Sequence, residues 1–179
     1  MNKLCKINKI IRVILIAIPI LTFIWLLDKN CFFSDSLKVV YKFDKNSPVI
    51  SILKPAGRVL KIEQDKSGDY WQKMIIDPVY FSLYLPTTKF KNAEFIFVFQ
   101  KPENQIIKIG PQIFNDSWGY YLEELKCEKT EGEWCIGKLN FDLSKTYIKD
   151  RKINFMISAP NLDKSGEFVK ISQINLKLE

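Results

Sequence analysis

The apolar run near the start of the chain constrains its fold most. Between Val13 and Leu27 only Pro19 and Thr22 interrupt strongly apolar side chains. Residues Ile10 to Leu27 would rise about 27 Å as a helix, close to the ~30 Å thickness of a bilayer's hydrocarbon core. We therefore expect one transmembrane helix over Ile10 to Leu27, with the rest of the chain on one side of a membrane.

Charge orients this helix. Four basic residues and no acids precede the apolar run: Lys3, Lys6, Lys9 and Arg12. Basic flanks stay in the cytoplasm, so the C-terminal part is expected to cross. A cleaved signal peptide has the same layout, but the exit sequence WLLDKNCFF offers no pair of small residues for cleavage. A buried globular helix is the third alternative.

These features give an expected organisation of four parts. Residues 1–9 form a basic cytoplasmic N-terminus, 10–27 an uncleaved signal anchor, 28–36 a short tether, and 37–179 an extracytoplasmic domain. Localisation is therefore expected at a cell membrane, as a single-pass protein. About 145 residues are enough to bury a core without a metal or several disulfides.

Composition excludes several kinds of chemistry. The formal charge is +7, but four of the 27 basic residues lie in the first 27 positions, which leaves 23 basic against 20 acidic residues beyond them. So small an excess does not predict nucleic-acid binding. The chain has no histidine. Serine and cysteine hydrolase triads and His-ligated zinc are therefore excluded, whereas chemistry by carboxylates alone is not.

Short alternating runs separated by turn residues fill the outer domain. The expected strands are LKVVYKF (37–43), VISIL (49–53), RVLKIEQ (58–64), YWQKMII (70–76), PVYFSLYL (78–85), AEFIFVFQ (93–100), IIKIG (106–110), GYYLEEL (119–125), EWCIGKLNF (133–141), KINFMISA (152–159) and FVKISQINLKL (168–178). No amphipathic helix separates them, although residues 142–150 could form a helical turn capped by Asp142 or Ser144. This pattern predicts an all-β fold, an antiparallel jelly-roll-like β-sandwich preceded by one N-terminal transmembrane helix.

Two cysteines flank a predicted hairpin turn. Cys127 and Cys135 stand on either side of Glu131 and Gly132, which could bring their side chains opposite each other. Outside the cytoplasm we expect a disulfide between them, stabilising by about 2–3 kcal/mol because the closed loop is short. Two unbridged cysteines on adjacent strands are the alternative.

The segment 114–121 combines aromatic and polar side chains more densely than any other. Flat rings can stack on a pyranose while Asn and Asp take hydrogen bonds from its hydroxyls. The candidate ligand-binding residues are Asp116, Trp118, Tyr120 and Tyr121. Alternatively these rings belong to the core, and at least one of the adjacent tyrosines should. Trp71 and Trp134, each within an expected strand, are interpreted as core residues.

Neither catalytic nor metal-binding residues are predicted. Acids cluster at Asp116, Glu123, Glu124, Glu131 and Glu133, but adjacent acids in a strand point to opposite faces and hairpin tips are solvated. The loops Asp65–Asp69 and Asp163–Glu167 each contain acids and a glycine, as calcium loops do. A plain turn needs the same residues, so we expect no cofactor, with a structural calcium ion as the alternative.

Two stretches carry a family resemblance. INFMISAPNLDKSGEFVKISQINLKLE (153–179) resembles the closing hairpin of jelly-roll carbohydrate-binding modules and of the galactose-binding-like fold. PVYFSLYLPTTKFKNAEFIFVFQKPENQIIKIG (78–110) is similar to their central strand pair. The resemblance implies a β-sandwich and a glycan ligand, but no ligand-binding motif matches residue by residue.

The sequence therefore predicts a membrane-anchored, non-catalytic binding module for a glycan or another surface polymer. The alternative is a structural or accessory subunit of a membrane protein complex, which the short tether favours. A hydrolase that uses carboxylates alone is the third interpretation. Expected partners are the membrane, through Ile10 to Leu27, and a glycan or a membrane protein.

Overall fold

The computed structural model of the chain describes residues 12, 14–26, 36–64, 68–114 and 119–179. The chain divides into two compact units, Met1–Asp35 and Ser36–Glu179. The second unit is a β-sandwich with its own hydrophobic core, so it is expected to fold without the first.

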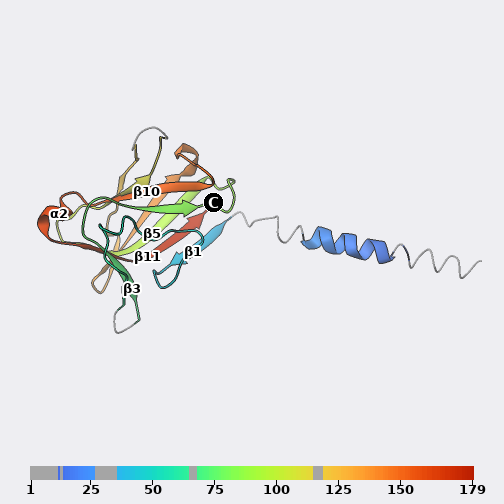
Figure 1. Cartoon of the computed structure of the whole chain (residues 1–179), viewed down its shortest axis with the longest axis horizontal. Helices are drawn as coiled ribbons and strands as arrows, with labels where there is room; N and C mark the ends of the chain where they lie inside the picture. The colour runs from blue at the N-terminus through green and yellow to red at the C-terminus, as the bar shows by residue number, and fades with distance from the viewer. Residues whose placement is uncertain (1–11, 13, 27–35, 65–67, 115–118) are drawn as a thin grey trace, which may run out of the picture. The chain divides into compact units, whose positions relative to one another are not determined.

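Eleven strands form two sheets in the described part of the second unit (Figure 1). The larger sheet runs β2 (Glu63–Gln64), β3 (Tyr70–Met74), β11 (Val169–Leu178), β5 (Asn92–Gln100), β9 (Trp134–Asp142) and β8 (Lys129–Glu131), with β1 (Leu37–Tyr41) also paired to β11. The smaller sheet runs β4 (Val79–Tyr84), β10 (Lys152–Ser158), β6 (Lys108–Pro111) and β7 (Glu123–Glu124).

All strand pairs between these elements are antiparallel, and the chain passes repeatedly from one sheet to the other. Successive strands from β3 to β6 alternate between the sheets, as do β9, β10 and β11. Crossing connections of this kind are typical of jelly rolls. The prediction of an antiparallel β-sandwich is confirmed.

Alternation along the central strands builds the core between the sheets. In β5, Phe95, Phe97 and Phe99 are buried, while Ile96 and Val98 lie on the outer face and are only half-buried. Strands β4 and β10 of the other sheet bury every second side chain in the same way. Period-two alternation with one buried face is the signature of a sheet packed on one side.

A cluster of phenylalanines joins the sheets. Phe81 and Phe155 stack with ring centroids 5.1 Å apart, and Phe155 meets Phe95 of the opposite sheet edge-on at 5.0 Å. Phe141 at the end of β9 contacts Phe95 and Phe155 at 6.0 and 5.5 Å. Aromatic pairs prefer these offset and edge-to-face arrangements.

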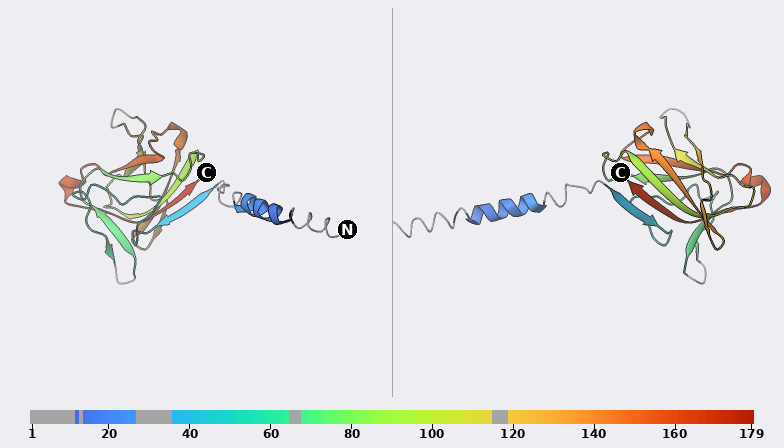
Figure 2. Two further views of the ribbon diagram at one scale, coloured as in Figure 1. Left: turned by 45° about the vertical axis from the view of Figure 1, so that its right-hand side comes forward. Right: turned by 180° about the vertical axis from the view of Figure 1, so that it is seen from behind.

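Two short helices interrupt the strands. The expected turn after Asp142 is a 3-10 helix, η1 (Leu143–Lys145), in which the Asp142 carboxylate accepts a hydrogen bond from the Ser144 backbone N–H. Helix α2 (Leu162–Ser165) ends at Gly166, whose positive φ of 69° closes the turn. In both views of Figure 2, α2 lies at one end of the sandwich and the C-terminus at the other, where β1 begins.

Several predictions about the strands were wrong or too long. Residues 49–53 form no strand, although they bridge Ile50 to Leu83 and exchange backbone hydrogen bonds with β4. The predicted strands 58–64 and 119–125 contain only the two-residue strands β2 and β7. Trp71 and Trp134 are not core residues. In β3 the alternation that buries Gln72 and Met74 places Trp71 on the outer face of the larger sheet, where its ring lies 6.3 Å from that of Trp134.

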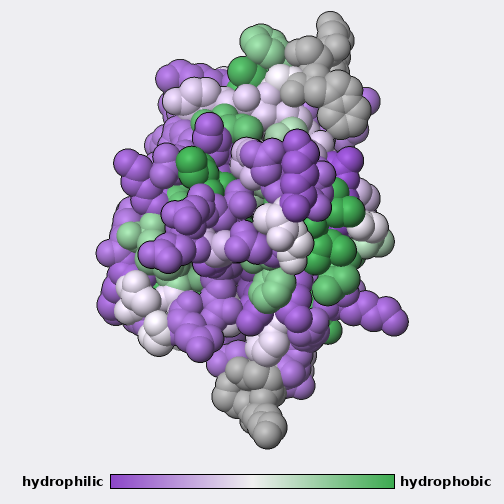
Figure 3. Space-filling view, turned by 90° about the vertical axis from the view of Figure 1, so that its left-hand side faces the viewer, coloured by the Kyte–Doolittle hydropathy of each residue, from purple (hydrophilic) through white to green (hydrophobic). Residues whose placement is uncertain are grey.

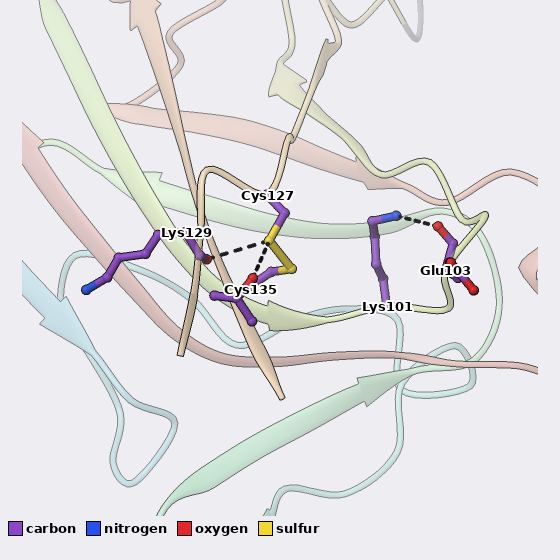
Figure 4. Close-up of a disulfide and its surroundings, with 6 residues drawn as sticks. Lys101, Glu103, Cys127, Lys129 and Cys135 are labelled. Atoms are coloured by element: carbon purple, nitrogen blue, oxygen red, sulfur yellow. Dashed lines mark hydrogen bonds between the residues drawn. A yellow bond between two sulfur atoms is a disulfide. The ribbon is translucent and has the colours of Figure 1, made fainter. Parts of the chain in front are cut away.

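A disulfide joins Cys127, just before β8, to Cys135 in β9 (Figure 4). Their Cα atoms are 5.2 Å apart, within the range that a disulfide can bridge. The Lys129 carbonyl oxygen lies 3.6 Å from the Cys127 sulfur. The bridge therefore fixes the chain that leads into the hairpin β8–β9 at the edge of the larger sheet.

The helix at residues 14–26 exposes its apolar side chains. Ten of them are between 44% and 65% exposed: Ile14, Leu15, Ile16, Ile18, Ile20, Leu21, Phe23, Ile24, Trp25 and Leu26. Among the residues that the structure describes, no helix has the length and apolar character to cross a membrane. Residues 10, 11, 13 and 27 of the predicted span lie outside the described residues.

Replacing Phe155 tests the contact between the sheets. Phe155→Ala should lower the free energy of unfolding of the Ser36–Glu179 unit by about 3–5 kcal/mol, because it opens a cavity in the aromatic cluster. Urea unfolding measures the loss. Ile106→Ala, at a side chain that is 50% exposed, is the control and should change stability by less than about 1 kcal/mol. Equal effects of the two variants would contradict the described core.

Candidate functional site

A groove of about 460 Å³ lies where the smaller sheet meets the end of β9. Residues from three regions line it: the chain after β6, the chain leading into β7, and the segment from β9 through η1. They are Pro111, Ile113, Phe114, Tyr121, Glu123, Phe141, Asp142, Lys145 and Thr146. Its volume falls in the range of small-molecule sites, and its lining is mainly apolar with a few polar groups.

Two aromatic side chains stand exposed at this groove. Phe114 is 58% exposed and Tyr121 is 56% exposed. Phe141, by contrast, is buried and contacts Phe95 and Phe155 of the core. The groove therefore has a rigid apolar base, and its two exposed rings remain available to a ligand.

Backbone hydrogen bonds hold the two chain segments beside each other. The Ile113 N–H donates to the Gly119 carbonyl over 2.9 Å, and the Tyr121 N–H donates to the Pro111 carbonyl over 3.0 Å. Residues 115–118 between these segments lie outside the described residues. Phe114 and Tyr121 are thus fixed to the same short ladder that extends β6.

A chain of side-chain hydrogen bonds leads to Phe114. The Gln112 Nε2 donates to the Phe114 carbonyl over 2.9 Å, and the Gln112 Oε1 accepts from Asn154 Nδ2 over 3.1 Å. Asn154 in turn accepts from the Ser82 hydroxyl over 3.1 Å. This network crosses three strands of the smaller sheet and fixes the backbone that carries the Phe114 ring.

Glycine allows the chain that carries Tyr121 to lie directly on the sheet. A Cβ at Gly110 would come 1.6 Å from the Tyr121 carbonyl oxygen, and one at Gly137 would come 2.3 Å from the Lys126 carbonyl oxygen. The segment 121–126 therefore passes from β6 of one sheet to β9 of the other in close backbone contact with both. No residue with a side chain fits at Gly110 without moving Tyr121.

The polar side of the groove is formed by Asp142, Lys145, Thr146 and Glu123. The Ser144 hydroxyl and backbone N–H donate to Asp142, and the Lys145 ammonium lies 3.2 Å from its carboxylate. These hydrogen bonds from Ser144, with Lys145 beside them, hold the pKa of Asp142 below its usual value. Asp142 is therefore an ionised hydrogen-bond acceptor at neutral pH.

Of the four predicted ligand-binding residues, the structure places Tyr121 in the groove. Tyr120 points elsewhere: its half-buried ring lies 6.0 Å from that of Tyr80, and this burial raises the pKa of the Tyr120 phenol. Asp116 and Trp118 lie outside the described residues. The two tyrosines thus point to different surroundings, as their adjacent positions predicted.

The sequence pattern predicts few of the groove residues. Phe114 lies at the edge of the predicted segment 114–121, where an aromatic residue beside a polar loop is the available signal. Lys145 and Thr146 come from a distant part of the chain, which nothing in their local sequence connects to Tyr121.

Of the acids that cluster in the sequence, Glu123, Glu131 and Glu133 do not converge, and Asp116 lies outside the described residues. Glu123 lines the groove, whereas Glu131 pairs with Lys129 and Glu133 accepts a hydrogen bond from Gln100 on the larger sheet. No group of three or more acids or cysteines that could hold a metal ion occurs in the described part of the chain. Residues 65–67 of the first proposed calcium loop are outside that part.

A second aromatic surface lies on the outer face of the larger sheet. The rings of Trp71 and Trp134 meet there, and the Lys170 ammonium lies 5.4 Å from the Trp71 ring centroid. The Trp71 Nε1 donates to Glu63 over 3.3 Å. Both indoles are half-buried by these contacts, unlike the rings of Phe114 and Tyr121.

Comparisons with known proteins find similar structures but no sequence family. No family model matches the chain, and no curated protein does. The similar solved structures include several carbohydrate-binding modules, the group that the sequence resemblance indicated.

Three of these structures illustrate the likeness. The CBM22-1 xylan-binding domain from Paenibacillus barcinonensis Xyn10C is 10% identical, with 78% of this chain and 92% of that one covered and a TM-score of 0.47. The xylan-binding module CBM15 is 15% identical, with 80% of this chain and 95% of that one covered and a TM-score of 0.48. The C-terminal CBM6 of LamC from Zobellia galactanivorans is 10% identical, with 79% of this chain and 98% of that one covered and a TM-score of 0.44. All three TM-scores lie below 0.5.

The close approach at Gly110 gives a test of the groove's construction. Gly110→Ala should destabilise the Ser36–Glu179 unit by about 1–3 kcal/mol, since the added methyl group must displace the Tyr121 backbone. Urea unfolding measures the loss, and changes in amide chemical shifts should centre on residues 119–125. Gly57→Ala is the matched control, because nothing lies within 4 Å of a Cβ there. A Gly110 variant as stable as the Gly57 variant would contradict this geometry.

Proposed function

We propose that Ser36–Glu179 is a non-catalytic glycan-binding module whose ligand lies in the groove of Phe114 and Tyr121. We further propose that residues 10–27 anchor it in a membrane with the module outside the cytoplasm. The observation that carries the first proposal is the pair of aromatic rings, each more than half exposed, beside polar side chains in one groove.

The aromatic rings provide the apolar part of such a site. A pyranose presents a face of C–H groups that stacks on a flat ring, and sites of this kind place a few polar groups around apolar walls. Phe114 offers a ring without a polar atom, and Tyr121 offers one with a phenol that can reach a hydroxyl. The groove volume of about 460 Å³ suits a short stretch of a polysaccharide better than a long chain.

The polar residues suit hydroxyl groups. The carboxylates of Glu123 and Asp142 and the lone pairs of the Thr146 hydroxyl can accept hydrogen bonds, and Lys145 can donate them. Thr146 already donates to the Leu143 carbonyl over 2.8 Å, which fixes its orientation. The sequence prediction that Asp116 and Trp118 also contact the ligand stays a prediction.

A non-catalytic role fits the ionisation of Asp142. Glycoside hydrolysis needs one carboxylic acid with a raised pKa that protonates the leaving oxygen. The hydrogen bonds from Ser144 lower the pKa of Asp142 instead, so Asp142 is a poor general acid. An ionised acceptor beside exposed rings favours binding over bond cleavage.

Removal of the exposed rings of Phe114 and Tyr121 tests the glycan proposal directly. Phe114→Ala and Tyr121→Ala should each weaken binding of the Ser36–Glu179 unit to its glycan by about tenfold or more, since about 1.4 kcal/mol of stacking is lost. A glycan array identifies the ligand and calorimetry measures the affinity.

Tyr84→Ala is the control, because Tyr84 is exposed but lies outside the groove. Binding that survives both groove variants would place the site elsewhere. The absence of any glycan binding would favour the alternative, a subunit of a membrane complex.

The anchor proposal rests on the charge and apolar patterns of residues 1–27 and on the exposed apolar side chains of the helix at 14–26. The full-length protein should resist extraction from membranes by alkaline carbonate. Ile16→Lys with Ile20→Lys should release it, because each lysine costs about 2.5–3.5 kcal/mol at the centre of a bilayer. Ile106→Lys, in the sandwich, should leave it in the membrane. Release of the unaltered protein by carbonate would contradict the anchor.

A further inference from the structure

The end of the sandwich at which the chain enters is a single surface built from several loops. Leu37 of β1 pairs with Leu178 of β11. The Asn92 N–H donates to the Glu179 carbonyl over 2.8 Å, and the Leu143 N–H donates to the Lys91 carbonyl over 2.7 Å. The Leu85 N–H donates to the Arg151 carbonyl over 2.7 Å, which joins β4 and β10 at the same end. We call this surface, formed by residues 36–38, 86–91, 142–152 and 177–179, the entry end.

The entry end is strongly basic. It carries three acids, Asp142, Asp150 and Glu179, against eight cations: Lys38, Lys89, Lys91, Lys145, Lys149, Arg151, Lys152 and Lys177. Apart from Lys152 and Lys177, these cationic residues are exposed. The entry end therefore has a net charge of +5, which is larger than the +3 of the whole outer domain.

Few of these cations are neutralised locally. Lys145 pairs with Asp142, and Lys177 pairs with Glu179. Among the described residues, the Arg151 guanidinium donates to the Pro86 carbonyl and forms no ion pair. Within the described ranges, Lys89, Lys91 and Lys149 have no ion pair. Their charges are consequently directed into solvent, where they can act on a partner.

Four loops at the opposite end of the sandwich carry the opposite charge. Residues 75–78, 101–107, 131–133 and 159–168 contain Lys101 and Lys164 against six acids: Asp77, Glu103, Glu131, Glu133, Asp163 and Glu167. Figure 3 views this end, around α2, and shows a mainly hydrophilic surface. The module therefore has a charge asymmetry along its long strands, and its basic pole is the end where the chain enters.

We propose that the entry end binds the anionic headgroups of the membrane in which the chain is anchored, an inference that rests on the anchor part of the proposed function. Residues 28–36 can span at most about 30 Å when fully extended, so the entry end stays near the bilayer surface. The tether therefore lets the entry end come within a Debye length, about 8–10 Å, of the bilayer surface, where anionic lipids attract each basic group.

This contact sets how the glycan groove is presented. Lys145 and Asp142 belong both to the groove and to the entry end. A sandwich seated on its basic pole therefore holds the groove close to the bilayer surface and turns its acidic pole away from it.

The experiment uses the Ser36–Glu179 unit, which has its own core, and vesicles of defined composition. The unit should sediment with vesicles of equal parts phosphatidylcholine and phosphatidylglycerol and not with phosphatidylcholine alone. Lys89→Gln with Lys91→Gln should weaken this binding about 30-fold, since each lysine contributes about 1 kcal/mol near an anionic surface. Higher salt should weaken it as well.

Lys101→Gln with Lys164→Gln removes the same charge at the opposite end and is the matched control, so it should leave vesicle binding within about twofold. Equal sensitivity of the two double variants would overturn the proposal, because only net charge would then matter. So would equal binding to both kinds of vesicle, or tighter binding to soluble polyphosphate than to anionic vesicles, which would assign the surface to an anionic polymer.

Glycan binding in the groove and lipid binding at the entry end can be contradicted independently of each other. Lys89 and Lys91 do not line the groove, so their variant should bind the glycan as the unaltered unit does. Loss of vesicle binding with glycan binding intact supports the entry end as a distinct surface. Glycan binding without any vesicle binding overturns the inference and leaves the module's function standing. Carbonate extraction tests the anchor independently of both.

Discussion

The packing of Phe141 is the interaction on which the rest of the structure depends. Its ring contacts Phe95 of one sheet and Phe155 of the other, and the same side chain forms part of the groove lining. The hydrophobic cluster that holds the sheets together therefore also forms the base of the candidate site. Because close-packed interiors yield little to small displacements, the groove that Phe114 and Tyr121 line has a fixed base at Phe141. Pre-organisation of this kind lowers the entropic cost of binding, which matters for a ligand held by few contacts.

A second constraint is the close contact of segment 121–126 with both sheets. It depends on the absence of a side chain at Gly110 and at Gly137, and the disulfide between Cys127 and Cys135 fixes the chain immediately after it. This segment carries Tyr121 to the groove and then covers the gap between β6 and β9. The position of the site is thus a consequence of how the sandwich closes at one edge.

The fold could be predicted from the sequence where the pattern was local. Alternation over 93–100 and 168–178 gave the central strands β5 and β11, and Asp142 capped the helical turn that follows it. The prediction that Trp71 is a core residue was wrong because an alternation of period two does not say which face of a strand is buried. In β3 the buried face carries Gln72 and Met74. The groove was predicted only in part. Tyr121 had a local signal, but its meeting with Lys145 depends on strand order, which no short stretch encodes. The basic entry end could not be predicted for the same reason, since its cations come from four separate segments of the chain.

The central claim is that the glycan binds in the groove lined by Phe114 and Tyr121. An NMR titration of the Ser36–Glu179 unit tests this claim most directly. Amide and side-chain resonances are followed as the glycan identified on an array is added. The account predicts that the largest shifts occur at residues 110–114, 119–123 and 141–146, with the indole N–H signals of Trp71 and Trp134 unmoved. Shifts centred on those two indoles would contradict it and would place the ligand on the outer face of the larger sheet.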